Sequence, residues 1–164
     1  QMLARANRFS EAMAVMVLDV DHFKRVNDTY GHATGDEVLR RLAGLMQSIV
    51  RGNDYLARYG GEEFVILMPD TPLESGVEVI TRLQRELTKA FFLSGREKVL
   101  ITFSAGVAQM EAEESMTDAI KRADGAMYLA KRTGKNRTCQ RCKRHRQQCG
   151  SRKGLAHSIS PSRY

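Results

Sequence analysis

An uninterrupted apolar run that ends in two aspartates restricts the fold of this chain more than any other feature. Residues 13–18 (MAVMVL) are apolar, and Asp19 and Asp21 follow directly. A run this short, bounded by polar residues, is typical of a buried strand. A carboxylate at the end of such a strand is costly unless another group pairs with it. The sequence therefore predicts a buried strand whose end carries a paired carboxylate.

The remaining apolar patterns predict alternating helices and strands. Helical spacing of apolar residues recurs over three segments, 38–50, 76–90 and 116–132. Strand-like runs occupy three more segments, 55–59, 64–68 and 99–108. Gly60-Gly61 between the first two of these runs is typical of a hairpin, and Gly134 is placed to end the last helix. With a helix ahead of the first strand, this order predicts an α+β, ferredoxin-like fold with a mostly antiparallel central sheet flanked by helices.

The net charge of +7 is concentrated near the C-terminus. Seven Lys and Arg residues, and no Asp or Glu, lie in residues 138–164, whereas residues 1–137 carry balanced charge. The expected folded part therefore gives no electrostatic reason to predict specific nucleic-acid binding. Apolar periodicity also stops after Arg137. We expect one domain over residues 1–137 and a basic, disordered tail over residues 138–164.

Composition also bears on where the chain works. No segment has the pattern of a membrane helix or a secretory signal, and the first residue is Gln1, so we expect a fragment of a longer protein. All three cysteines lie near the C-terminus and outside the expected core: Cys139, Cys142 and Cys149. This predicts a reducing, cytoplasmic setting, either for a free protein or for the cytoplasmic part of a membrane-anchored one. With His145 they could hold zinc, but an unfolded tail is favoured because the spacing is tight.

Acidic and basic residues gather around the predicted strand end and hairpin. If the hairpin lies beside the first strand, Asp19 and Glu62 converge, and two such carboxylates repel unless one is protonated or a cation lies between them. Hard oxygen ligands favour magnesium, or manganese. Three lysines could bind phosphates beside that metal: Lys24, Lys131 and Lys135. Asn27 and Asp36 together offer the donors and acceptors that read a purine edge, so the pattern suits a nucleoside triphosphate.

Residues 60–64 (GGEEF) carry a family resemblance, because they match the GGDEF or GGEEF signature of diguanylate cyclases. The likeness extends to five more motifs: LDVDHFK at 18–24, ND at 27–28, GH at 31–32, GD at 35–36 and KRTGKNR at 131–137. It covers roughly residues 5–137. The resemblance implies a cyclase-palm-like form of the fold. It also implies bacterial second-messenger signalling, in which two GTP molecules are joined into cyclic di-GMP and two pyrophosphates by two-metal-type nucleotidyl transfer.

The resemblance implies a role for each matching position. The implied metal site comprises Asp19, the Val20 carbonyl, Glu62 and Glu63. The implied catalytic residues are Glu62, Glu63 and Lys24. The implied GTP site comprises Phe23, Lys24, Asn27, Asp36, Leu39, Gly60, Gly61, Lys131 and Lys135, with Asn27 and Asp36 on the guanine. Two domains would meet head to tail, so a homodimer would be needed, and a sensory or receiver domain would precede this one.

A second motif of the family lies ahead of the two glycines. Arg51 and Asp54 match its RxxD inhibitory site at the same offset. The resemblance implies that these residues bind the product cyclic di-GMP, helped by Arg82, and cause non-competitive inhibition. A surface ion pair with the same spacing is the alternative interpretation.

Several observations limit the resemblance. The Asp-x-Leu-Thr-x-Leu-x-Asn-Arg stretch that normally precedes the first long helix is absent, and Lys135 stands where arginine is frequent. A non-catalytic cyclic di-GMP receptor and a relative with altered nucleotide preference are the alternatives to an active cyclase. The intact signature favours the cyclase. Four nearby polar residues are expected to play no part in metal binding or proton transfer: Asp21, His22, Asp28 and His32.

Overall fold

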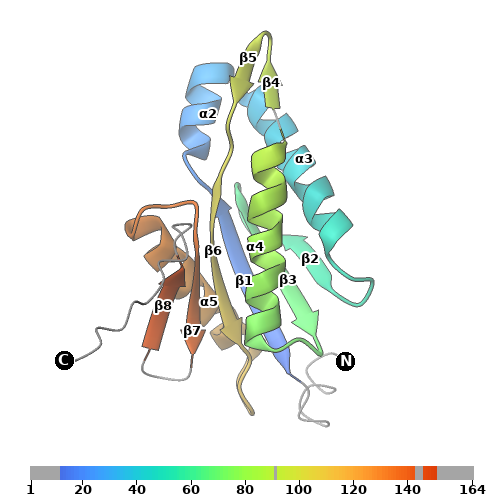
Figure 1. Ribbon diagram of the computed structural model, residues 1–164, viewed down its shortest axis with the longest axis vertical. Coiled ribbons are helices and arrows are strands. Elements are labelled where there is room, and N and C mark those ends of the chain that lie inside the picture. The colour runs from blue at the N-terminus through green and yellow to red at the C-terminus, as the bar shows by residue number, and fades with distance from the viewer. Residues whose placement is uncertain (1–11, 91, 143–145, 151–164) are drawn as a thin grey trace, which may run out of the picture.

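The computed structural model describes residues 12–90, 92–142 and 146–150 (Figure 1). The strands of its main sheet are β1 (Met13–Val20), β2 (Tyr55–Arg58), β3 (Glu63–Pro69), β6 (Phe103–Gln109), β7 (Thr138–Cys142) and β8 (Arg146–Gly150). The helices are α2 (Phe23–Tyr30), α3 (His32–Ile49), α4 (Leu73–Lys89) and α5 (Met116–Arg132). A separate hairpin consists of β4 (Phe92–Ser94) and β5 (Glu97–Val99).

The described strands of the main sheet lie in the order β2-β3-β1-β6-β7-β8. All neighbouring pairs are antiparallel except β6 and β7, which run parallel. All eight residues of β1 are buried, because this strand lies inside the sheet and both faces are covered. The structure confirms the predicted α+β fold with a mostly antiparallel sheet flanked by helices.

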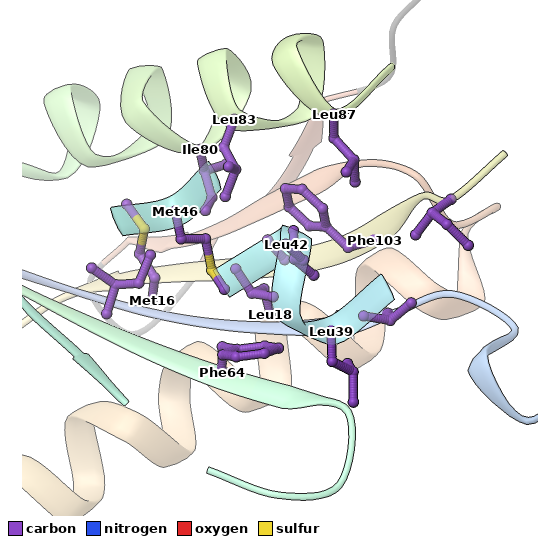
Figure 2. Packing of buried hydrophobic residues seen from close by; sticks show 14 of the residues in the cluster. Met16, Leu18, Leu39, Leu42, Met46, Phe64, Ile80, Leu83, Leu87 and Phe103 are labelled. Carbon is purple, nitrogen blue, oxygen red and sulfur yellow. The ribbon is translucent and has the colours of Figure 1, made fainter. Parts of the chain in front are cut away.

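Alternate residues of β1 point into two separate cores. Met16 and Leu18 pack with residues of α3 and α4 on one face, where Phe64 and Phe103 add aromatic bulk (Figure 2). Val17 belongs to the core under α5 on the other face. This alternation follows from the twofold side-chain period of a strand. It also places Asp19 on the α5 face, two residues beyond Val17.

Several elements differ from the sequence-based expectation. Helix α2 and the β4–β5 hairpin were not predicted, α3 begins at His32 rather than at residue 38, and β6 begins at Phe103 rather than at residue 99. Helix α2 has eight residues and buries Phe23 and Val26, too few to produce a recognisable helical period. The predicted helix ahead of β1 lies outside the described residues. No helix in the described ranges is long and apolar enough to cross a membrane.

The segment after Arg137 departs from the predicted disordered tail, because residues 138–142 and 146–150 form strands. Strand β7 pairs with β6, so backbone hydrogen bonds rather than apolar periodicity hold it. Cys139 is fully buried against Ala126 and Ala130 of α5 and takes part in a disulfide. The expectation that every cysteine lies outside the core is therefore wrong, and the disulfide differs from the reduced thiols that were expected of a reducing setting. The suggested zinc ligand His145 lies outside the described residues.

Gly106 allows α5 to lie directly on the backbone of β6. A Cβ at this position would lie 1.9 Å from the Ala123 carbonyl oxygen and 2.3 Å from the Met127 nitrogen. We predict that Gly106→Ala lowers the free energy of unfolding by about 3 kcal/mol, since neither backbone can move away cheaply. Urea denaturation measures this change.

Gly44→Ala is the matched control, because Gly44 is exposed within α3 and a Cβ there would meet nothing within 4 Å. It should raise the free energy of unfolding by up to about 1 kcal/mol through helix propensity. Equal stability of the two variants would contradict this account of the β6–α5 contact.

Candidate functional site

Four segments meet at the end of the sheet where β1 finishes. They are the residues that follow β1, the turn between β2 and β3, the start of β6 and the loop after α5. The register of the sheet produces this meeting, because Asp19 pairs with Glu63 across β1 and β3, and with Ser104 across β1 and β6. The Val20 N–H also donates to the Glu62 carbonyl oxygen at 3.2 Å. The predicted convergence of the strand end with the hairpin is present.

Asp19 and Glu62 form the centre of the site, and we refer to them as the carboxylate pair. Asp19 is buried at 7% exposure, and its Oδ1 accepts a hydrogen bond from Lys131 Nζ at 2.5 Å. The two carboxyl groups of the pair lie close enough for each to affect the pKa of the other. Lys131 reaches the pair from the last turn of α5, so this lysine balances part of the buried negative charge.

Three carboxyl groups of the site, Asp19, Glu62 and Glu63, have raised pKa values. Burial raises the pKa of Asp19, although the Lys131 ammonium opposes the shift. Burial, followed by the negative charge of Asp19, raises the pKa of Glu62. Burial and Asp19 act in the same way on the pKa of Glu63, with a further contribution from Asp124. The site therefore favours protons or other cations between its oxygens.

The glycine turn is held by the residue that precedes it by two positions. Arg58 donates from Nε to the Gly60 carbonyl oxygen at 3.2 Å and from a terminal guanidinium nitrogen to the Gly61 carbonyl oxygen at 2.5 Å. A Cβ at Gly60 would lie 2.3 Å from a Glu63 carboxylate oxygen, so a side chain there would displace the Glu63 carboxylate. Gly61 is open, with nothing within 4 Å of its Cβ position. Arg58 was not singled out from the sequence, since an arginine near a hairpin is common.

A second part of the site lies between α2 and α3. The Asn27 side-chain oxygen is buried without a hydrogen-bond partner. Gly35 makes room for it, because a Cβ at this position would lie 1.9 Å from that oxygen. Asp36 and Leu39 line a neighbouring cavity of about 450 Å³ together with Phe64. An unpaired buried acceptor beside a cavity lined by a carboxylate is suited to a ligand that carries N–H donors.

The three predicted phosphate-binding lysines have different surroundings. Lys131 contacts Asp19, as described above. Lys24 is 88% exposed and pairs with Asp28 one turn further along α2, at 2.9 Å. Lys135 lies in the loop after α5 and has a positive φ of 59°. The structure thus brings Lys131 to the carboxylate pair and places Lys24 and Lys135 on the two segments that flank it.

Asp21 behaves as a structural residue, as the sequence suggested. Its buried carboxylate accepts hydrogen bonds from the Thr102 and Ser104 hydroxyls and from the Asn136 backbone N–H. Asp28 contacts the side chain of Lys24 instead of the backbone. His22 caps the start of α2 with a left-handed backbone, φ 58°. Among the described residues, no three His, Cys, Asp or Glu side chains form a ready-made metal cluster.

The predicted inhibitory residues line a separate cavity of about 780 Å³ between α4 and the segment that follows α3. Asp54 accepts a hydrogen bond from the Arg51 backbone N–H at 2.7 Å, and its other oxygen is buried without a partner. Arg82 lines the same cavity from α4 and donates to the Ile49 carbonyl oxygen at 3.0 Å. The contact between Arg51 and Asp54 is thus made by the backbone, which leaves the Arg51 guanidinium for the cavity.

Asp124 was also missed, although a signal for it existed. It precedes Lys131 by seven residues, which is about two helical turns and therefore the same face of α5. Its charge acts on Glu63 across the gap between the helix and the sheet. The sequence does not show that this face of α5 meets the glycine hairpin, because that depends on how the helix packs on the sheet.

The raised pKa of Glu62 predicts an unusual pH dependence of stability. A carboxyl group with a higher pKa in the folded than in the unfolded protein stabilises the fold when it is protonated. This stabilisation is complete when the pH is below the ordinary pKa of 4.5, and it is lost as the pH rises through the pKa of the folded state. Without metal, Glu62→Gln should therefore be more stable than the parent at neutral pH, and the difference should shrink toward pH 4.5. Urea denaturation across this range measures it.

Glu86→Gln is the opposite control, because the hydrogen bond from Lys89 lowers the pKa of Glu86. The stability that Glu86 contributes is present at neutral pH, so this variant should be the less stable one there. Parallel pH profiles for Glu62→Gln and the parent would show that the carboxylate pair is not strained.

Comparison with known proteins identifies the family. A family model described as "Diguanylate cyclase, GGDEF domain" matches residues 1–137. The diguanylate cyclase DgcP of Pseudomonas aeruginosa is 43% identical over 137 residues, which cover 84% of this chain and 20% of that protein. The response regulator PleD of Caulobacter vibrioides is 40% identical over 138 residues, which cover 82% of this chain and 30% of that protein. The chain thus spans less than a third of the length of either relative.

Solved structures agree with this match. The GGDEF domain of DgcB from Caulobacter crescentus, in complex with c-di-GMP, superposes with a TM-score of 0.79 at 35% identity, over 84% of this chain and 82% of that one. The active GGEEF domain of a diguanylate cyclase from Vibrio cholerae gives a TM-score of 0.79 at 35% identity, over 85% of this chain and 88% of that one. The chain therefore belongs to the GGDEF domain family of diguanylate cyclases.

Proposed function

We propose that this domain joins two GTP molecules into cyclic di-GMP and releases two pyrophosphates. The observation that carries the proposal is the carboxylate pair of buried Asp19 and half-buried Glu62, which lies beside Lys131 at the sheet end, while an unpaired Asn27 oxygen lies between α2 and α3. The chain aligns with 20% of the length of one relative and 30% of another. The first of these is named a diguanylate cyclase, which supports the same activity.

The residues at the sheet end fit a divalent metal ion. The two carboxyl groups of the pair act on each other's pKa, the pKa values of both are raised, and hard oxygen atoms are the ligands that magnesium or manganese prefers. Asp19, Glu62 and the Val20 carbonyl would hold the ion, with support from Glu63. When bound, such an ion neutralises phosphate oxygens and favours ionisation of an attacking hydroxyl. Phosphate and water oxygens would complete its coordination.

The cavity between α3 and strands β2 and β3, together with Asn27 of α2, provides the base specificity in this proposal. Guanine carries N–H donors on one edge, and these would satisfy the unpaired Asn27 oxygen and the Asp36 carboxylate. Phe23 lies against Gly35 and, with Leu39, would form the apolar wall beside the base. An adenine base offers a different set of donors and acceptors on this edge, so the same residues favour GTP.

The flanking cations and the glycine turn would hold the triphosphate. Lys131 would share its charge between Asp19 and the phosphates, while Lys24 and Lys135 would approach from the two flanking segments. The open surface at Gly61 leaves space for the phosphates beside the backbone. In this arrangement the protein orients the reacting groups and stabilises negative charge, which is how most phosphoryl-transfer sites work.

One domain would provide half of the reaction. The 3′-hydroxyl of each GTP would attack the α-phosphorus of the other, so we infer a head-to-tail homodimer. The long relatives also support further domains beside this one, such as a sensory or receiver domain. Since GTP is a cytoplasmic metabolite, we infer a cytoplasmic place of action.

The α4 cavity is the proposed site of product inhibition. The Arg51 guanidinium, the unpaired Asp54 oxygen and Arg82 offer forked donors and an acceptor, which suit the phosphates and guanine edges of cyclic di-GMP. A c-di-GMP complex of the similar DgcB domain supports binding of this ligand by the family.

Loss of the carboxylate pair should abolish synthesis. We predict that Asp19→Ala or Glu62→Ala lowers the rate of cyclic di-GMP formation from GTP and magnesium by about 100-fold or more, because the metal loses a ligand. Chromatography and mass spectrometry identify the product, at high protein concentration so that dimers form. Lys121→Ala, on the exposed side of α5, is the matched control and should keep the parent rate. Absence of product from the parent, even when dimerised by fusion, would contradict the cyclase assignment.

Loss of the arginine in the α4 cavity should relieve inhibition. We predict that Arg51→Ala weakens cyclic di-GMP binding about tenfold or more and leaves initial rates at low product unchanged, since the cavity is separate from the sheet end. Calorimetry measures the affinity, and progress curves with added cyclic di-GMP measure the inhibition. Lys89→Ala, which removes an exposed cation of α4 that does not line the cavity, should change neither. If the parent makes no product but binds cyclic di-GMP, and Arg51→Ala removes that binding, the domain is a receptor instead.

A further inference from the structure

Asp21 is a buried carboxylate for which the proposed reaction has no use. It is 4% exposed, and both of its oxygens are engaged. Oδ1 accepts from the Ser104 hydroxyl at 2.7 Å, and Oδ2 accepts from the Thr102 hydroxyl at 2.8 Å and from the Asn136 N–H at 2.9 Å. The Asp21 N–H in turn donates to the Thr102 carbonyl oxygen at 2.8 Å.

These bonds join segments that lie far apart in the sequence. Asp21 follows β1, the two hydroxyl donors lie at the start of β6, and Asn136 lies in the loop that connects α5 to β7. The separation between Asp21 and Asn136 is 115 residues. A single carboxylate therefore connects the strand end that carries Asp19 with the loop that carries Lys135.

The loop in question, residues 133–137, has an unfavourable backbone. Lys135 and Asn136 both have positive φ angles, 59° and 46°, a region that side chains with a Cβ rarely adopt. The Lys135 N–H donates to the Ala130 carbonyl oxygen, which ends α5, and the Arg137 side chain donates to the Lys135 carbonyl oxygen. The bond from the Asn136 N–H to Asp21 is the contact that ties this strained turn to the β1 end of the sheet. Strained backbone of this kind persists where surrounding contacts determine it.

We propose that Asp21 is a positioning residue, which holds the 133–137 loop so that Lys135 faces the triphosphate. The proposal rests on the proposed function, in which Lys135 binds a phosphate. Three hydrogen bonds occupy most of the lone pairs of this carboxylate, so it is poorly placed to bind a metal as well. The Asp-x-Asp pattern after β1 thus divides into a metal-site residue, Asp19, and a residue that organises the loop.

Asp21→Asn tests this role with almost no change in volume. The new amide is neutral and keeps one acceptor oxygen, so the bond from the Asn136 N–H loses the charge of the carboxylate, and it is lost entirely where the amide nitrogen faces the loop. We expect about tenfold weaker binding of a non-hydrolysable GTP analogue with magnesium, measured by calorimetry. Guanosine, which lacks phosphates, should bind with unchanged affinity, because Asn27 and Asp36 are untouched.

A double-mutant cycle separates positioning from general damage. Lys135→Met alone should also weaken binding of the analogue about tenfold. If Asp21 acts through Lys135, adding Asp21→Asn to Lys135→Met should cause little further loss, because the lysine that the loop positions is already gone. Multiplied losses in the double variant, or weaker guanosine binding by Asp21→Asn, would overturn the proposal.

Thr102→Val keeps the experiment decisive if Asp21→Asn does not fold. This variant removes one donor to Asp21 and preserves the carboxylate, so it should cause a smaller loss of analogue affinity that also disappears on Lys135→Met. If Thr102→Val still lowers the affinity for the analogue in a protein that already carries Lys135→Met, the positioning role is overturned. A parent protein that binds guanosine but gains no affinity from the triphosphate would refute phosphate binding by Lys135, whereas a parent that binds neither would refute the proposed function itself.

Discussion

Burial of the Asp19 carboxylate at the end of β1 is the interaction on which the rest of the site depends. The strand is buried on both faces, so its terminal carboxylate lies in a poorly solvated place next to Glu62. Burial raises the pKa values of both groups, and the charge of Asp19 raises the pKa of Glu62 further, so the pair favours a neighbouring cation. Lys131 meets that need within the chain, and its separation from Asp19 is 112 residues. The electrostatics of this one group thus connect the first strand of the sheet to the last helix.

Strand β1 and helix α5 place the charged groups of the site. The alternation of β1 directs Met16 and Leu18 toward α3 and α4 and sends Asp19 to the α5 side. Because Gly106 has no side chain, α5 lies close to the backbone of β6, and Lys131 at the end of α5 reaches the end of β1. The site is thus built on a rigid sheet and helix, while the glycine turn and the loop after α5 provide the approach for a ligand. Rigid elements that support loops are the usual arrangement where charges must be held in place.

Much of the fold followed from local patterns, and the errors have physical causes. Long periodic segments such as α3, α4 and α5, and apolar runs such as β1, were predicted because their burial produces a strong period. Helix α2 and the β4–β5 hairpin are short and bury few residues, so they give a weak signal. Strand β7 was mistaken for tail because its sequence is polar and basic, and its pairing with β6 depends on the backbone.

By itself, the sequence determined the order of most elements, the family motifs and the identity of the residues with charge or hydrogen-bonding groups. The tertiary structure alone decided which of these groups touch: Lys131 with Asp19, Arg58 with the glycine turn, and Asp21 with the loop that carries Lys135. It also decided that the Asn27 oxygen is buried and unpaired against Gly35. The reason is that the Lys131–Asp19 and Asn136–Asp21 contacts depend on sheet register and on the packing of α5, and they join residues 112 and 115 positions apart. The local contacts of Arg58 and Asn27 depend on side-chain orientation, which a pattern of apolar and polar residues does not specify either.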